Sequence, residues 1–188
     1  MKKTYSPVPL SRFHRLFYPI VATVVTSRQE EDVGGMAAVS YVPLSFDPPL
    51  VGVSIQPGHR THRLVSASGY FAINWVDRAH ADKIEAMGSP TERRVKDKIK
   101  ACDFTHHPGQ EAPVPVVDQA VAALECRVRE RHRTGDHDLF VGEVLAAYTI
   151  SDFEEYWRFE GYSPALYAGS TESEKGETRL RFLELDVG

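Results

Sequence analysis

The sequence contains few cysteines and no long apolar segment. Cys102 and Cys126 are the two cysteines of the 188-residue chain, too few for the disulfide framework of a small secreted protein. No stretch approaches the roughly 20 consecutive apolar residues that cross a bilayer. No apolar segment of a signal peptide follows Lys2 and Lys3. We therefore expect a cytoplasmic protein with free thiols and no membrane anchor.

Positive charge is not in excess either, because the formal net charge is -4. Nucleic acid is not expected as the main partner, since phosphate backbones are bound by basic surfaces. Hydrophobic residues make up 42% of the chain and charged residues 26%, which is typical of a globular protein with its own core. The length suits one domain and no linker or repeat divides it, so residues 1–188 are predicted to form a single domain.

Short β-branched or alternating runs, separated by turn residues, predict a series of strands. A polar turn over 27–32, followed by Gly34-Gly35, separates the first two runs and indicates a hairpin. The predicted strands are 20–26, 36–42, 50–55, 70–76, 124–128, 139–150 and 179–185. Many short strands with small helical insertions favour an all-β or β+α fold, here a closed barrel of six or so strands with a few short peripheral helices.

Three short helices are predicted between these strands. They cover 61–68, 77–88 and 91–100, with candidate N-caps at Thr61 and Asp77 and terminating glycines at Gly69 and Gly88. The segment 106–117 contains several prolines and is predicted to form an extended loop.

The segment 38–54 combines an abrupt strand end with a rigid Asp47-Pro48-Pro49 loop. Such a place leaves backbone N–H and C=O groups unpaired, and a flat heterocycle with an imide edge can pair with them. An ordinary strand, a proline turn and a second strand are the alternative. The residues alone leave both interpretations open.

The segment 58–63, Gly-His-Arg-Thr-His-Arg, lies at the start of the first predicted helix. A helix N-terminus presents free N–H groups and the positive end of the helix dipole. Arg60 and the Thr61 hydroxyl add donors of the kind that a phosphate needs; a capped surface helix is the alternative. A second basic cluster could close over the same anion or be a solvated helix face, and it comprises Gly88, Ser89, Arg93, Arg94, Lys96 and Lys98.

His137 follows Gly135 and Asp136 in a predicted hairpin turn. A histidine in a loop beside an aspartate can contact a coenzyme or transfer a proton, whereas an ordinary surface histidine is the alternative. A solvated outer strand face is predicted for Glu125, Arg127, Arg129, Arg131 and Arg133, with an acidic ligand as its alternative.

No metal site is predicted, because Cys102, His106 and His107 lack the further ligands of a tetrahedral zinc site. No Ser-His-Asp triad or pair of catalytic carboxylates can be derived from the spacing.

Several segments between about residues 18 and 167, in their order and spacing, resemble the flavin reductase family, which is built on the FMN-binding split barrel. That family includes the small reductase components of styrene-type two-component monooxygenases and the flavoredoxins. The matching segments are Pro19, 24–26, 39–41, 45–49, 53–55, 60–62, 88–89, 97–98, 124–126, 135–137 and 139–142. The region between Gly88 and Lys98 is about one residue longer than the family's usual run.

The resemblance implies an NAD(P)H:flavin oxidoreductase that binds FMN without a covalent bond at the interface of a homodimer. Hydride would pass from NADH or NADPH to the flavin, and reduced flavin would be supplied to a partner monooxygenase. FAD in place of FMN, a non-enzymatic FMN electron carrier with a redox-protein partner, and a barrel without redox function remain as alternatives.

The resemblance also implies a role for individual residues. Met36, Ala37, Ala38, Val39, Ser40 and Tyr41 would flank the isoalloxazine, and Ser54, Arg60, Thr61, Ser89 and Lys98 would lie on the phosphate side. His137 would face the nicotinamide as the catalytic residue. Aromatic residues that could cover a partner subunit or close the base of the barrel are Tyr156, Trp157, Phe159 and Tyr162.

Overall fold

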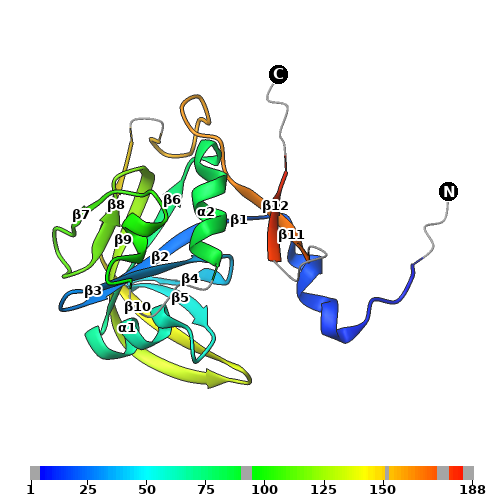
Figure 1. Cartoon of the computed structure of the whole chain (residues 1–188), viewed down its shortest axis with the longest axis horizontal. Coiled ribbons are helices and arrows are strands. Elements are labelled where there is room, and N and C mark those ends of the chain that lie inside the picture. Colours follow the sequence, from blue (N-terminus) through cyan, green and yellow to red (C-terminus); the bar gives the residue numbers. More distant parts are fainter. Residues whose placement is uncertain (1–4, 90–94, 151–152, 173–177, 184–188) are drawn as a thin grey trace.

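The computed structural model describes residues 5–89, 95–150, 153–172 and 178–183. Within these ranges no helix has both the length and the apolar character needed to cross a membrane. The largest element is a seven-stranded antiparallel sheet in the order β3-β2-β6-β9-β10-β5-β4 (Figure 1). Its strands are β2 (Thr23–Gln29), β3 (Asp32–Ala38), β4 (Tyr41–Phe46), β5 (Pro49–Ile55), β6 (Tyr70–Val76), β9 (Ala120–Thr134) and β10 (His137–Thr149).

Strands from both halves of this sheet share one apolar core. Val25 of β2 and Val53 of β5 lie on opposite sides of the strand order, yet both are fully buried in the same cluster. Phe71 of β6 and Phe140 of β10 belong to the same buried cluster. The sheet therefore curls around its own inner face, as the predicted barrel requires.

The barrel remains open along one seam, which corrects the predicted closed form. β3 and β4 are the two edges of the sheet, and residues 39 and 40 connect them. The Ser54 amide of β5 donates to the Ser40 carbonyl at 2.9 Å, which extends the pairing of β5 with β4 by one residue towards this connection. Pro43 sits within β4, where an edge strand tolerates its missing N–H.

The hairpin predicted around the two glycines forms, but with a tighter turn. β2 pairs with β3 from Thr23↔Ala38 to Gln29↔Asp32, so the glycines lie inside β3 and the turn is confined to residues 30 and 31. The predicted strand over 36–42 is divided between β3 and β4 for the same reason. Local propensity located the hairpin, whereas the paired register determined its ends.

Short helices pack outside the barrel. They are α1 (Arg60–Ser68), η2 (Arg78–His80), α2 (Ala81–Gly88) and α3 (Lys98–Ala101). Gly69 ends α1 in the left-handed conformation (φ 75°), and the Asp77 carboxylate accepts the Ala79 amide at the start of η2, as predicted. Of the third predicted helix, residues 91–94 lie outside the described residues, and α3 is confined to its end.

A second, three-stranded sheet with order β1-β11-β12 projects from the barrel together with η1 (Leu10–Phe17), on the right of Figure 1. Its strands are β1 (Ile20–Val21), β11 (Leu166–Glu172) and β12 (Thr178–Phe182). The single strand predicted over 20–26 is thus split at Ala22, whose amide donates to the Ala165 carbonyl at 2.8 Å. β11 was not predicted from the sequence.

The outer face of β9 is solvated only in part. Glu125 was predicted on a solvated face but is fully buried, because the segment 106–117 packs over it as β7 (His106–Pro108) and β8 (Pro115–Val117). Its carboxylate accepts three backbone N–H groups, from Gln110, Glu111 and Ala112, at 2.6–2.8 Å. Further along β9 the arginines are partly exposed and share carboxylates: Arg127 and Arg129 with Glu143, and Arg131 and Arg133 with Asp138.

Candidate functional site

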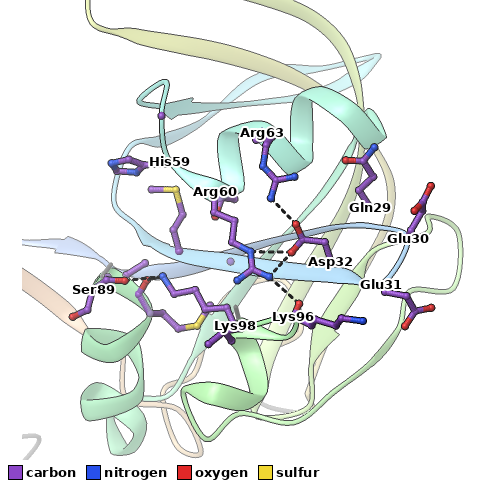
Figure 2. Close-up of a pocket in the computed structure, with 18 residues that line it drawn as sticks. Gln29, Glu30, Glu31, Asp32, His59, Arg60, Arg63, Ser89, Lys96 and Lys98 are labelled. Carbon is purple, nitrogen blue, oxygen red and sulfur yellow. Dashed lines mark hydrogen bonds and ion pairs between the residues drawn. The ribbon is translucent and has the colours of Figure 1, made fainter. Parts of the chain in front are cut away.

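A cavity of about 980 Å³ opens between β3, the N-terminus of α1 and the C-terminus of α2 (Figure 2). Ligand and cofactor sites typically occupy about 300–1,000 Å³. The lining residues are Gln29, Glu30, Glu31, Asp32, Gly35, Met36, Ala37, Gly58, His59, Arg60, Thr61, Arg63, Met87, Gly88, Ser89, Val95, Lys96 and Lys98.

The two glycines of β3 set the spacing of the helices that border this cavity. A Cβ at Gly34 would lie 2.6 Å from Leu64 Cδ1 of α1, and one at Gly35 would lie 2.6 Å from Met87 Cε of α2. The Val25 carbonyl oxygen, at 2.9 Å, would also meet a Cβ at Gly35. Only a residue without a side chain allows both helices to approach β3 this closely.

The N-terminus of α1 faces the cavity without a side-chain cap. His59 is the N-cap residue, and its side chain makes no capping hydrogen bond. The prediction of Thr61 as N-cap is therefore wrong: Thr61 is buried in the first turn, one residue after α1 begins. The first amides of a helix have no intrahelical acceptor, so this end offers free N–H groups and the positive end of a dipole.

Arg60 is fixed at the same end of the cavity by two acceptors. Its Nε donates to Asp32 Oδ1 at 2.9 Å, its Nη2 also contacts this oxygen, and Nη2 donates to the Lys96 carbonyl at 2.8 Å. Its Nη1 is buried and has no hydrogen-bond partner among the residues that the structure describes. A buried, unpaired guanidinium nitrogen is costly, and an anionic ligand at this point would pair with it.

Lys98 reaches the cavity from α3 and binds the end of α2. Its Nζ donates to the Met87 carbonyl at 2.8 Å and to the Ser89 carbonyl at 2.9 Å. Burial lowers the pKa of this ammonium, and the charge of Arg60 acts in the same direction. An ammonium has three N–H donors, so these two carbonyls leave one donor for a ligand.

Two histidines lie near the mouth of the cavity. Partial desolvation of its ring lowers the pKa of His59, and the charges of His137 and Lys98 act in the same direction, which keeps the imidazole neutral at pH 7. His137 begins β10, and its Nδ1 lies 2.8 Å from Asp136 Oδ1. His137 is not among the lining residues, but its neighbour Asp138 pairs with Ile55 at the end of β5, three residues before Gly58 of the cavity lining.

The structure brings together about half of the residues predicted for the site. Those that line the cavity are Met36, Ala37, Arg60, Thr61, Ser89 and Lys98. The lining does not include Ala38, Val39, Ser40, Tyr41 or Ser54. The Tyr41 hydroxyl donates to the Val21 carbonyl of β1 at 3.0 Å and so links the barrel to the projecting sheet, whereas the Ala38 carbonyl accepts the Thr23 hydroxyl at 3.2 Å within the barrel. Arg93 and Arg94 lie outside the described residues.

Sequence reasoning missed the acidic partner of Arg60. Asp32 was assigned to a polar turn, and nothing in its neighbourhood distinguishes it from Glu30 or Glu31. Its contact with Arg60 joins residues 28 positions apart, and it exists because the hairpin register places Asp32 opposite Gln29, beside α1. His59 and Arg63 belong to the segment singled out for an anion, but were not predicted individually.

The residues considered for zinc are engaged elsewhere. His106 Nε2 lies 2.8 Å from Asp97 Oδ2, and His107 Nδ1 lies 2.6 Å from Asp118 Oδ1. Cys102 is buried in the apolar cluster beside α2. Among the described residues, no group of three or more histidine, cysteine, aspartate or glutamate side chains is arranged to hold a metal ion.

Comparison with known families adds a decisive observation. The model of the flavin reductase like domain matches residues 13–171, which cover the barrel, the helices around the cavity and most of the projecting sheet. The chain belongs to the flavin reductase family. The fold predicted from the sequence, an FMN-binding split barrel with short peripheral helices, is confirmed.

This member of the flavin reductase family is similar in sequence to several other proteins and in structure to several solved proteins. An uncharacterised protein of Aeropyrum pernix is 36% identical over 165 residues, which cover 87% of this chain and 63% of that protein. The NADH-dependent flavin reductase StyB of Pseudomonas fluorescens is 30% identical over 134 residues, covering 71% of this chain and 74% of that protein. A crystal structure of an FMN-binding protein from Thermus thermophilus, with bound 1-cyclohex-2-enone, has a TM-score of 0.73 and 34% identity and covers 100% of both chains.

The cavity has the donor set that the phosphate end of a flavin nucleotide needs. Arg60 Nη1 is buried and unpaired, and the α1 N-terminus beside it is uncapped. Gly35 keeps the cavity floor free of a side chain, and Met36 and Ala37 offer partly exposed apolar surface next to it. The residues present therefore fit FMN.

We predict that Lys98→Met lowers the free energy of unfolding by about 2–3 kcal/mol, because it leaves two carbonyls near the end of α2 without their charged donor. Lys100→Met on the same helix is the matched control, since the Lys100 side chain is 67% exposed and its ion pair with Asp97 spans 3.7 Å. The control should change stability by less than about 0.5 kcal/mol. Urea unfolding followed by circular dichroism measures the free energy of unfolding of both variants. An equal decrease in the two variants would contradict the role of Lys98 as the donor to the carbonyls at the end of α2.

Proposed function

We propose that this protein is an NAD(P)H:flavin oxidoreductase that binds FMN in the cavity beside α1. The observation that carries the proposal is the buried Nη1 of Arg60, which has no partner in the described part of the chain, next to an uncapped helix N-terminus. Charge-assisted hydrogen bonds from a guanidinium and from helix amides are the usual means of holding a phosphate monoester. Family membership is the supporting observation.

In this proposal Arg60, Thr61 and the first amides of α1 hold the phosphate, and Lys98 and Ser89 lie on the same side. Met36 and Ala37 provide an apolar wall for the ring system. The bound flavin supplies the acceptor for two electrons and a proton, delivered as hydride by the nicotinamide. Such a transfer depends on the two rings being held in close contact, so the residues of this chain act by binding and orientation.

The proposed role in the cell is to supply reduced flavin to a partner monooxygenase, as the resemblance to two-component systems implies. A cytoplasmic location is part of the same proposal. It agrees with the two cysteines of the chain, Cys102 and Cys126, which are buried and free, because free thiols persist in a reducing compartment.

We expect the purified protein with FMN to oxidise NADH or NADPH, with a steady loss of the coenzyme absorbance. The StyB relative is an NADH-dependent flavin reductase, so both coenzymes should be compared. Titration with FMN, FAD and riboflavin, followed by flavin fluorescence, identifies the preferred flavin. Tighter binding of FAD than of FMN would replace FMN by FAD in the proposal.

Other outcomes of this assay separate the alternatives. Flavin binding without coenzyme oxidation, with reduction only by a protein donor, would indicate an electron carrier. A protein that stays colourless, and leaves flavin fluorescence unchanged at every concentration, would falsify the proposed function altogether.

We further propose that His137 contacts the nicotinamide coenzyme, with Asp136 holding its ring. His137→Ala should then leave FMN binding nearly intact and raise the apparent KM for NAD(P)H. Loss of one hydrogen bond to a charged group costs about 1.5–3 kcal/mol, which is roughly a tenfold to hundredfold decrease in kcat/KM. Steady-state kinetics at wild-type values, or loss of FMN from the variant, would exclude this role.

A homodimer is the proposed assembly, and it is supported by the exposed apolar surface of η1, which projects from the barrel together with the three-stranded sheet. The η1 helix exposes four large apolar side chains: Leu10 (86%), Phe13 (57%), Leu16 (70%) and Phe17 (72%). Exposed apolar patches of this kind mark interaction surfaces. Of the aromatic residues considered for the same purpose, Tyr162 is buried against Trp157 and Phe159, whereas Tyr156 is 70% exposed.

Light scattering should return twice the chain mass with flavin bound. Phe13→Asp combined with Leu16→Asp should shift the protein towards the monomer, because charges replace apolar contact surface. Asp82→Ala, at an exposed position of α2, controls for effects of mutation and purification that are unrelated to η1. It should leave the measured mass unchanged. A monomeric wild-type protein that still binds flavin would contradict an interfacial site.

A further inference from the structure

One carboxylate accepts hydrogen bonds from both arginines that line the cavity beside the N-terminus of α1. Asp32, the first residue of β3, lies between Arg60 and Arg63 of α1 (Figure 2). Its Oδ1 accepts from Nε and Nη2 of Arg60, and its Oδ2 accepts from Nη2 of Arg63 at 2.5 Å. Both carboxylate oxygens are therefore used by cations that also line the cavity.

The edge of Arg60 that Asp32 occupies is the one best suited to an anionic ligand. Nε and Nη2 of an arginine form a planar fork that binds carboxylate or phosphate oxygens in pairs. With this fork engaged, Nη1 is the nitrogen of Arg60 that finds no partner among the described residues. The second nearby cation, Arg63, is paired with the same carboxylate.

Asp32 is charged at neutral pH and faces the ligand space. Burial raises the pKa of its carboxyl, but hydrogen bonds from Arg63 and Arg60 outweigh this effect and hold the pKa below its ordinary value. Its side chain is 31% exposed, and it lines the cavity. A fixed negative charge beside a phosphate site repels the ligand as well as occupying its donors.

We propose that Asp32 is a built-in counter-anion that competes with the flavin phosphate for Arg60 and Arg63, and so weakens the binding of phosphorylated flavin. This inference rests on the proposed function, which places the flavin phosphate at the α1 N-terminus. Weakened binding suits a reductase whose flavin leaves after each turnover, because a tightly held cofactor could not be passed to a partner.

A purely orienting role for Asp32 leads to the opposite expectation. If Asp32 served only to aim Arg60, its removal would weaken FMN binding. The Lys96 carbonyl, however, also accepts Nη2 of Arg60 at 2.8 Å. Arg60 therefore keeps an anchor when the charge of Asp32 is removed, and its fork becomes available to the phosphate.

The test compares FMN with riboflavin, which has the same ring system but no phosphate. In Asp32→Asn we expect the Kd for FMN to decrease at least fivefold, while the Kd for riboflavin changes less than twofold. Asp32→Glu keeps the charge and should bind FMN as the wild type does. Asp82→Asn makes the same chemical change at an exposed position of α2 that does not line the cavity, and it should alter neither Kd.

Fluorescence titration at low salt measures each Kd, and circular dichroism confirms that each variant is folded. Asp32→Ala serves as a second neutral variant in case Asn at this position disturbs the hairpin. An unchanged or increased Kd for FMN in the folded neutral variants would overturn the competition, while leaving the flavin site itself in place. Absence of flavin binding in the wild type would overturn both proposals.

Discussion

The close packing of two helices on the glycines of β3 is the constraint on which the cavity depends. Leu64 of α1 lies against Gly34 and Met87 of α2 lies against Gly35, where any side chain would overlap them. This contact brings the N-terminus of α1 and the C-terminus of α2 to the same space. Helix ends carry partial charges of opposite sign, so the packing of an apolar surface also determines the electrostatics of the site.

The C-terminus of α2 has a charged side chain as a hydrogen-bond donor, whereas the N-terminus of α1 has no side-chain cap. Lys98 binds carbonyls at the end of α2 and offsets its negative character. The end of α1 has no side-chain cap, so its positive character persists in the cavity. The balance therefore favours an anion on the α1 side, and Asp32 moderates that preference through the two arginines of the same helix.

Local sequence patterns were sufficient for most of the barrel. β-branched runs located β5 and β6, and Gly69 ended α1 as expected, because such signals act over a few residues. Predictions failed where distant segments intervene. The run over 20–26 is split because Ala22 pairs with Ala165, and Glu125 is buried because the segment 106–117 covers it.

The sequence by itself determined the alternation of strands, the helix that begins beside Arg60, and the family to which the chain belongs. These properties reside in residue order and spacing, so they can be recognised without coordinates. Only the tertiary structure decided which residues of the 36–41 segment reach the cavity and which acid faces Arg60. Those contacts depend on hairpin register and on how closely α1 approaches β3, and both result from packing between residues far apart in the chain.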